Sequence, residues 1–116
     1  MKWGKCRWGS LKIDGEKYKK DVILDRGNLR PRKKKPSREF REEFGHTPLS
    51  LKEEIPWECK RLVSGTGIDG RLPIMDDVLD EAKRRGVEVV ACPTPEAVKM
   101  LTDNPADTNA ILHVTC

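Results

Sequence analysis

Apolar and polar positions alternate along the first part of the chain in the manner of β-strands. Residues 8, 10 and 12 (Trp, Ser and Lys) alternate with residues 9, 11 and 13 (Gly, Leu and Ile). Asp14-Gly15 then suits the positive φ of a hairpin turn. Residues 18–24 follow as the return strand, and a second turn is predicted at residues 25–28. The pattern therefore predicts an N-terminal β-hairpin.

Two short helices are predicted next. Ser37 is placed to cap the first, which Gly45 would end. Residues 50–53, Ser-Leu-Lys-Glu, match the capping box of the second, in which Ser bonds an amide and Glu reaches back to the start of the helix. Pro56 would end that helix.

From residue 61 the pattern becomes an alternation of strand and helix. A strand over residues 61–66 leads to a helix from Pro73, and a strand over residues 87–92 follows the stop signal at Gly86. The helix carries one apolar stripe, made of Met75, Val78, Leu79 and Ala82. A strand–helix–strand unit of this length favours a right-handed parallel crossover.

A further helix and a last strand complete the pattern. Thr94 is predicted as the N-cap of a helix with Pro95 in its first turn, and residues 110–115 form the strand. We therefore expect one domain over residues 1–116 with a compact three-layer α/β fold. Its central sheet should be mixed, and the N-terminal β-hairpin should extend this sheet or pack over it.

Composition narrows the class of protein. The chain has 116 residues, 36 % of them apolar, and no apolar run approaches the roughly 18 residues that span a bilayer. The basic first residues have no apolar stretch behind them, so they lack the body of a secretory signal. We expect a cytoplasmic protein without a membrane span.

The net charge of +4 is unevenly distributed. Residues 1–44 carry a net +8 and residues 45–116 a net −4. Much of the excess lies in a basic patch that is predicted to be an exposed loop or edge. It contains Arg30, Arg32, Lys33, Lys34, Lys35 and Arg38. Only Phe40 is interleaved as an aromatic and no recognition motif is present, which favours an acidic protein partner over nucleic acid.

Cysteine and histidine spacing indicates no metal site and no cofactor. The four cysteines form no C-x-x-C pair, and no histidine lies at zinc-finger spacing. His113 and Cys116 have opposite parity in the last strand, so their side chains are expected on opposite faces. No catalytic residue is assigned from the sequence.

Residues 65–70, Gly-Thr-Gly-Ile-Asp-Gly, match the spacing of a dinucleotide-binding loop, but Arg71 and Leu72 separate the last glycine from the helix. A phosphate or carboxylate on the loop amides is the remaining binding hypothesis. Because loops that follow parallel strands meet at one sheet edge, we expect a ligand site there. The candidate residues are Gly65, Thr66, Gly67, Gly70, Arg71 and Thr94, with His46 as a lid contribution.

Several motifs together resemble the Mth-domain family. They are Gly65-Thr66-Gly67-x-x-Gly70-x-Leu72, Arg85-Gly86-Val87-Glu88-Val89, Pro93-Thr94-Pro95-Glu96-Ala97-Val98 and Leu112-His113-Val114-Thr115-Cys116. The family includes prokaryotic proteins of unknown function, the adipogenesis-associated Mth-domain protein and a mitochondrial assembly factor of respiratory complex I. The resemblance implies a compact three-layer α/β fold and, for the mitochondrial relatives, a role in protein assembly. It supplies no catalytic residue.

Two functional hypotheses follow. The first is a non-catalytic protein-binding or assembly module that uses the basic patch and exposed aromatics such as Trp3 or Trp57. The alternative is a small-molecule or anion-binding protein, or an enzyme, that acts at the Gly65–Gly70 loop. The sequence leaves the partner and the oligomeric state open.

Overall fold

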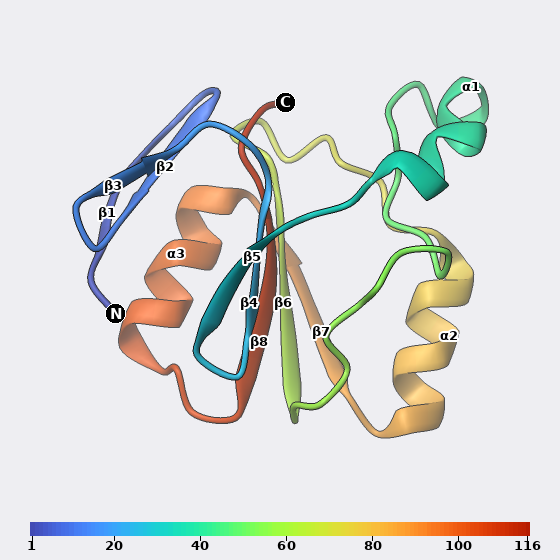
Figure 1. Cartoon of the computed structure of the whole chain (residues 1–116). Coiled ribbons are helices and arrows are strands. Elements are labelled where there is room, and N and C mark those ends of the chain that lie inside the picture. The colour runs from blue at the N-terminus through green and yellow to red at the C-terminus, as the bar shows by residue number, and fades with distance from the viewer.

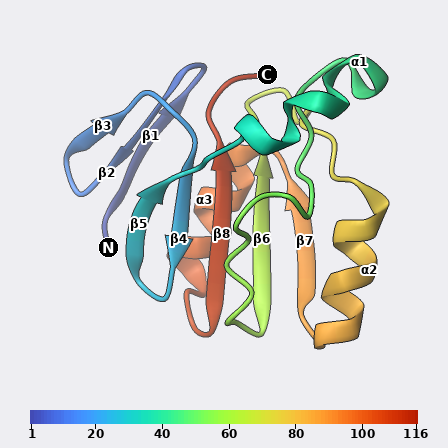
Figure 2. The ribbon, with the colours of Figure 1, turned by 45° about the vertical axis from the view of Figure 1, so that its right-hand side comes forward.

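A five-stranded mixed sheet forms the centre of the molecule in the computed structural model, which describes residues 1–116 (Figures 1 and 2). In spatial order its strands are β5 (Asn28–Pro31), β4 (Val22–Asp25), β8 (Thr108–His113), β6 (Arg61–Thr66) and β7 (Glu88–Cys92). β6 is parallel to both β7 and β8, whereas β4 is antiparallel to β5 and β8. The predicted mixed central sheet is therefore confirmed.

Helices cover both faces of this sheet. α2 (Asp76–Arg85) lies on one face and α3 (Thr94–Asp103) on the other (Figure 1). A second, three-stranded antiparallel sheet covers the outer side of α3. Its strands are β1 (Trp3–Arg7), β2 (Ser10–Ile13) and β3 (Glu16–Tyr18). The three-layer α/β expectation holds, with this small sheet added outside α3.

Side chains of the central strands divide between two apolar cores, one on each face of the sheet. Neighbouring residues in a strand point to opposite faces, so Val63 packs toward α3 and Leu62 packs toward α2. Leu11 and Ile13 of β2 close the α3 core from outside, and both are fully buried. Every apolar face of the central sheet is thus covered.

The N-terminal hairpin is shorter than its pattern predicts. Asp14-Gly15 does form the turn, with positive φ at both residues, but the return strand ends at Tyr18. Residues 22–24 instead belong to β4 of the central sheet. Val22, Ile23 and Leu24 are apolar on both faces, which is the pattern of a covered inner strand rather than of a half-exposed hairpin.

The two short predicted helices are only partly present. A 3-10 helix, η1 (Lys35–Phe40), runs into α1 (Arg41–Phe44), which Gly45 ends with a φ of 74° as expected. Ser37 caps neither, and residues 50–53 form a turn rather than a helix. The Glu53 carboxylate does not reach back to an amide because it binds buried groups described below.

Helix boundaries in the second half mostly follow the sequence signals. α2 begins at Asp76 rather than Pro73 and ends at Gly86, whose φ is 71°. α3 begins at Thr94, with Pro93 before it as the capping residue. The prediction that Thr94 is the N-cap is wrong, and its hydroxyl instead donates a hydrogen bond to the His113 carbonyl. None of the helices has the length and apolar character needed to cross a bilayer.

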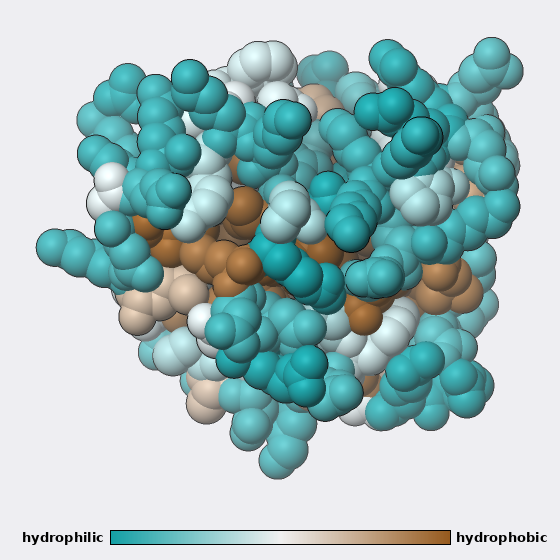
Figure 3. All heavy atoms as spheres, in the orientation of Figure 1, coloured by the Kyte–Doolittle hydropathy of each residue, from teal (hydrophilic) through white to brown (hydrophobic).

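The chain leaves β8 after His113, so residues 114–116 are not part of the strand. They continue beyond the upper end of β8 and end above the top of β6 in the view of Figure 2. Hydrophilic side chains crowd the upper part of the face in Figure 3, over the small sheet and over η1 and α1. The polar top of the molecule is where the candidate residues gather.

Candidate functional site

The glycine loop, residues 65–71, meets the start of α3 through two reciprocal hydrogen bonds between Gly67 and Thr94. The Gly67 amide donates to Thr94 Oγ1 at 2.9 Å, and the Thr94 amide donates to the Gly67 carbonyl, also at 2.9 Å. Gly65 allows this approach, since a Cβ there would lie 2.9 Å from Thr94 Oγ1. The structure therefore brings together the glycine loop and Thr94, as expected for loops that follow parallel strands.

Residues 115 and 116 occupy the amides of this loop. The Ile68 amide donates to the Thr115 carbonyl at 2.8 Å, and the Asp69 and Arg71 amides donate to the Cys116 carbonyl at 3.2 and 3.1 Å. Gly67 has a φ of +102°, and a Cβ there would lie 2.4 Å from the carbonyl carbon of Cys116. The amides proposed to hold an anion thus bind the chain's own carbonyl groups.

His46 lines a different cavity from the glycine-loop residues, and its lid contribution stays a prediction. It follows α1, is half-buried, and lines a cavity of about 350 Å³ together with His113, Thr115 and Cys116. We call this space the histidine cavity. Its cationic lining comes from Lys34, Arg38 and Arg41. Two residues of the glycine loop, Thr66 and Gly70, line a separate cavity beside Cys92 and Pro93.

A chain of contacts joins Asp21, His113 and Cys116. The carboxylate Oδ2 of Asp21 lies 2.8 Å from Nδ1 of His113, and Nε2 of His113 lies 2.8 Å from Sγ of Cys116. The prediction that residues 113 and 116 face apart is wrong, because β8 ends at His113 and the chain turns before Cys116. Thr115 Oγ1 also lies 3.1 Å from Nε2 of His113.

Asp21 is held as an acceptor on both oxygens. Its Oδ1 accepts a bond from the Val114 amide at 3.1 Å, and its Oδ2 accepts one from Arg32 at 2.9 Å. Burial by itself would raise the pKa of Asp21, but the His113 ring, the Arg32 guanidinium and the Val114 amide together hold it below its ordinary value. The carboxylate that faces His113 is therefore ionised.

Arg32 is buried, contrary to the expectation that the whole basic tract is exposed. Its side chain has 0 % exposure and forms a forked pair with Glu53 at 2.8 and 2.9 Å in addition to the bond with Asp21. The Ser37 hydroxyl donates to the same Glu53 at 2.6 Å. Burial by itself would lower the pKa of Arg32, but its acidic neighbours Glu53 and Asp21 raise this pKa above its ordinary value.

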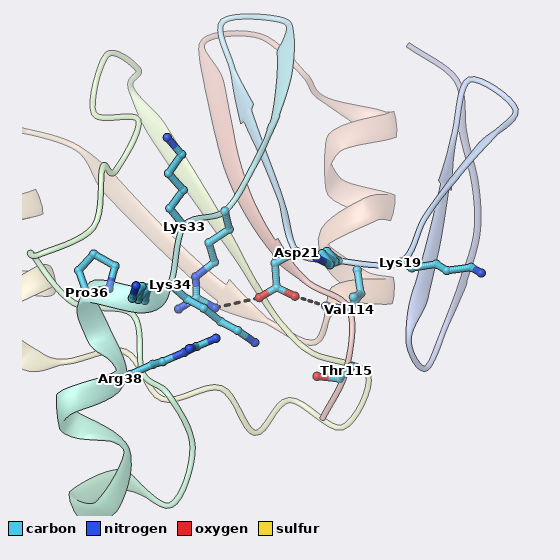
Figure 4. A pocket seen from close by; sticks show the side chains of 11 residues that line it. Lys19, Asp21, Lys33, Lys34, Pro36, Arg38, Val114 and Thr115 are labelled. Atoms are coloured by element: carbon cyan, nitrogen blue, oxygen red, sulfur yellow. Dashed lines mark hydrogen bonds and ion pairs between the residues drawn. The ribbon is translucent and has the colours of Figure 1, made fainter.

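The other basic residues line a second space, which we call the basic cavity. It has a volume of about 630 Å³ and adjoins the histidine cavity, with which it shares Lys34, Arg38 and Thr115. Its cations besides buried Arg32 are Lys19, Lys20, Lys33, Lys34, Lys35 and Arg38. In Figure 4 the Arg38 side chain extends from η1 toward Asp21 and Thr115, while Lys19 and Lys33 extend away from Asp21.

None of these six cations belongs to a salt bridge. Asp21 is the acidic residue in the lining of the cavity, and its charge is already shared between Arg32 and His113. Arg30, the remaining member of the predicted patch, pairs instead with Asp25. The basic cavity therefore carries positive charge that the protein does not neutralise.

Sequence reasoning missed Asp21 and the pairing of His113 with Cys116. Asp21 lies 92 residues from His113 in sequence, so no local spacing joins them. One usable signal was present, since an acidic residue directly before a fully apolar strand is a candidate for a buried partner. No three His, Cys, Asp or Glu side chains converge in a way that could hold a metal ion.

Solved structures with the same arrangement of elements were found. Conserved hypothetical protein PH1505 from Pyrococcus horikoshii OT3 is 28 % identical, with a TM-score of 0.81 over 100 % of both chains. MT938 is 26 % identical, with a TM-score of 0.69 over 98 % of this chain and 97 % of its own. A Bordetella pertussis protein described as an Mth938-like domain is 14 % identical, with a TM-score of 0.59 over 92 % of this chain and 81 % of its own.

Neither a scan against protein-family models nor a search of curated proteins found a match. The solved neighbours extend over nearly the whole chain and share its fold. They agree with the resemblance that the sequence motifs indicate.

Proposed function

We propose that this chain, whose structural neighbours are Mth938-like domain proteins of the Mth-domain family, binds a small anionic ligand in the basic cavity. The observation that carries the proposal is the set of six unpaired cations around one concave space. A ligand with a phosphate or carboxylate group would neutralise this charge.

Electrostatic attraction between these cations and an anionic ligand favours binding. Two unit charges 4 Å apart attract by about 1 kcal/mol in water and by about 4 kcal/mol near a protein surface. Lys34 and Arg38 both line the basic cavity and the adjoining histidine cavity, so one bound anion can lie near both cations. Several such contacts made together would give measurable affinity at low ionic strength.

The shape of the basic surface supports a small ligand more than a docked protein. The cations surround a hollow, and two of them are shared with the adjoining histidine cavity. Trp3 and Trp57, which the sequence offered as exposed docking residues, pack against the two cores and are half-buried. A protein-binding or assembly role remains a prediction, as does a cytoplasmic location.

Titration of the protein with inorganic phosphate and with citrate tests the proposal. In low-salt buffer, nitrogen-15 NMR should show saturable shifts of the backbone amides of residues 33–35, 37–38 and 114–115. Arg38→Glu and Lys34→Glu should each weaken the affinity at least tenfold, about 1.4 kcal/mol. Lys99→Glu on the exposed side of α3 is the matched control and should bind as the wild type does. Equal affinity of all three variants would overturn the proposal.

A further inference from the structure

We propose that Cys116 is a nucleophile that accepts an acyl group from an anionic ester or thioester, with His113 as its base and Asp21 as a positioning residue. The substrate class rests on the proposed function, because the anionic part of the acyl compound would lie among the cations of the basic cavity. The nucleophile itself rests on the separate geometry of three side chains.

The hydrogen bonds fix which ring nitrogen of His113 carries the proton. An ionised carboxylate only accepts hydrogen bonds, so Nδ1 of His113 donates to Oδ2 of Asp21 at 2.8 Å. Nε2 is then the acceptor in the neutral ring, and its lone pair faces the Cys116 thiol at 2.8 Å. This is the order of nucleophile, base and orienting carboxylate used by enzymes with activated thiols.

Positions of the three groups are held from several sides. Asp21 is fixed by Arg32 and by the Val114 amide, and the backbone of Cys116 is fixed by the Asp69 and Arg71 amides. The His113 carbonyl accepts the Thr94 hydroxyl at 2.6 Å. Such support holds a catalytic geometry without motion of the reacting groups.

The remaining cysteines lack this environment. Cys6, Cys59 and Cys92 have no histidine contact, and the Cys59 thiol donates to the Pro56 carbonyl instead. Burial raises the pKa of each of these three thiols. They therefore serve as internal controls for the reactivity of Cys116.

The charge near Cys116 also suits a nucleophilic thiol. Its side chain and that of His113 line the histidine cavity, where Arg38 and Arg41 contribute positive charge. An acyl compound could lie with its carbonyl carbon beside Sγ and its anionic end among Lys34 and Arg38, which both cavities share. The cations would also stabilise the negative charge that develops on the carbonyl oxygen.

The reaction balances without an oxidant or another co-reactant. Sγ of Cys116 forms a bond to the carbonyl carbon as the thiol proton moves to Nε2 of His113. The bond to the leaving alkoxide or thiolate breaks, and the leaving group takes that proton. Water then attacks the acyl-cysteine, gives a proton to Nε2 and releases the acid, after which that proton returns to the sulfur.

Alkylation by neutral chloroacetamide, read at each cysteine by mass spectrometry, tests the thiol. Cys116 in the native protein should react at least tenfold faster at pH 7 than each of the other three cysteines. His113→Gln should lower the rate at Cys116 at least tenfold. Because this variant removes a buried ring, its fold is checked by circular dichroism, and the wild-type comparison among four thiols stands without it. A rate at Cys116 equal to that of a free model thiol would overturn the proposal.

The positioning role of Asp21 is tested by a measurement that a loss of stability alone would not change, the pH profile of Cys116 alkylation. Other ionisable or charged groups facing the pair are Lys34, Arg38, Arg41 and His46, and they are unchanged in Asp21→Asn. This variant should shift the pH profile of Cys116 alkylation toward that of a free thiol. A lower melting temperature with an unchanged profile would overturn the positioning role.

Acyl transfer is tested with the mono-p-nitrophenyl ester of terephthalic acid, whose carboxylate cannot reach its own ester carbonyl, and p-nitrophenyl benzoate is the neutral comparison. The anionic ester should release one equivalent of p-nitrophenol rapidly and leave a 4-carboxybenzoyl adduct on Cys116. Cys116→Ala should abolish both signals, and Cys92→Ala is the matched control. If the protein binds phosphate but Cys116 is unreactive, this inference alone is overturned. If both esters react equally and phosphate does not bind, the anionic substrate class and the proposed function are overturned.

Discussion

Thr94 and Gly67 bind each other twice, once through the two backbones and once through the Thr94 hydroxyl. The same hydroxyl donates to the His113 carbonyl at 2.6 Å, so one buried side chain links α3 to the glycine loop and to β8. This junction therefore fixes the glycine loop against the end of β8.

Thr94→Val should destabilise the protein by about 1–3 kcal/mol, because the Gly67 amide and the His113 carbonyl would lose a buried partner. Thr94→Ser keeps the hydroxyl and should recover most of the loss. Urea denaturation followed by circular dichroism measures both. Equal losses in the two variants would assign the effect to packing rather than to the hydrogen bonds.

Gly67→Ala should release residues 115 and 116 from the glycine loop. The new Cβ would lie 2.4 Å from the Cys116 carbonyl carbon, which is backbone and must move. Hydrogen exchange should show reduced protection of the Ile68 and Arg71 amides. Gly86→Ala is the matched control, since Gly86 also has positive φ but nothing lies within 4 Å of its added Cβ. Unchanged protection in Gly67→Ala would contradict the contact.

Arg32→Met should cost about 3–5 kcal/mol of stability, because Asp21 and Glu53 would remain as buried charges without their shared cation. Arg84→Met removes an exposed pair with Glu81 and should cost far less, because water screens that pair. Chemical denaturation at pH 7 compares the two. A small loss for Arg32→Met would mean that water reaches the cluster.

The stability contributed by Asp21 should disappear in acid. The pKa of Asp21 is lower in the folded protein than its ordinary value of 3.8, so its contribution is present above that value. It is lost as the pH falls through the folded pKa. The difference in unfolding free energy between wild type and Asp21→Asn should be largest above about pH 5 and should shrink below about pH 4. A difference that is independent of pH would contradict this ionisation.

Local signals predicted the second half of the chain well. Asp76 and Asp77 lie in the first turn of α2, basic residues lie in its last turn, and Gly86 ends it, so the helix and its neighbouring parallel strands could be placed from sequence. The meeting of the glycine loop with Thr94 also followed, because the carboxyl ends of parallel strands share one edge.

Other features depended on partners distant in sequence. Arg32 looks like its exposed neighbours in a charged run, but its side chain is buried among partners distant in sequence. Asp21 and Glu53 lie 11 and 21 residues away, and Pro48 lies 16 residues away. Glu53 matched a capping box but binds Arg32 and Ser37 instead. The parity argument for His113 and Cys116 assumed that the strand continues, whereas β8 ends at His113.

The place of β8 between β4 and β6 constrains the order in which the sheet can form during synthesis. The β4–β5 hairpin and the β6–α2–β7 unit emerge from the ribosome first, yet they do not pair with each other. Residues 108–113 must be synthesised before these two halves can join. Completion of the sheet therefore depends on contacts between residues distant in sequence, which form slowly. Nascent chains shorter than this therefore expose two unpaired inner strand edges, where chaperones or aggregation would act.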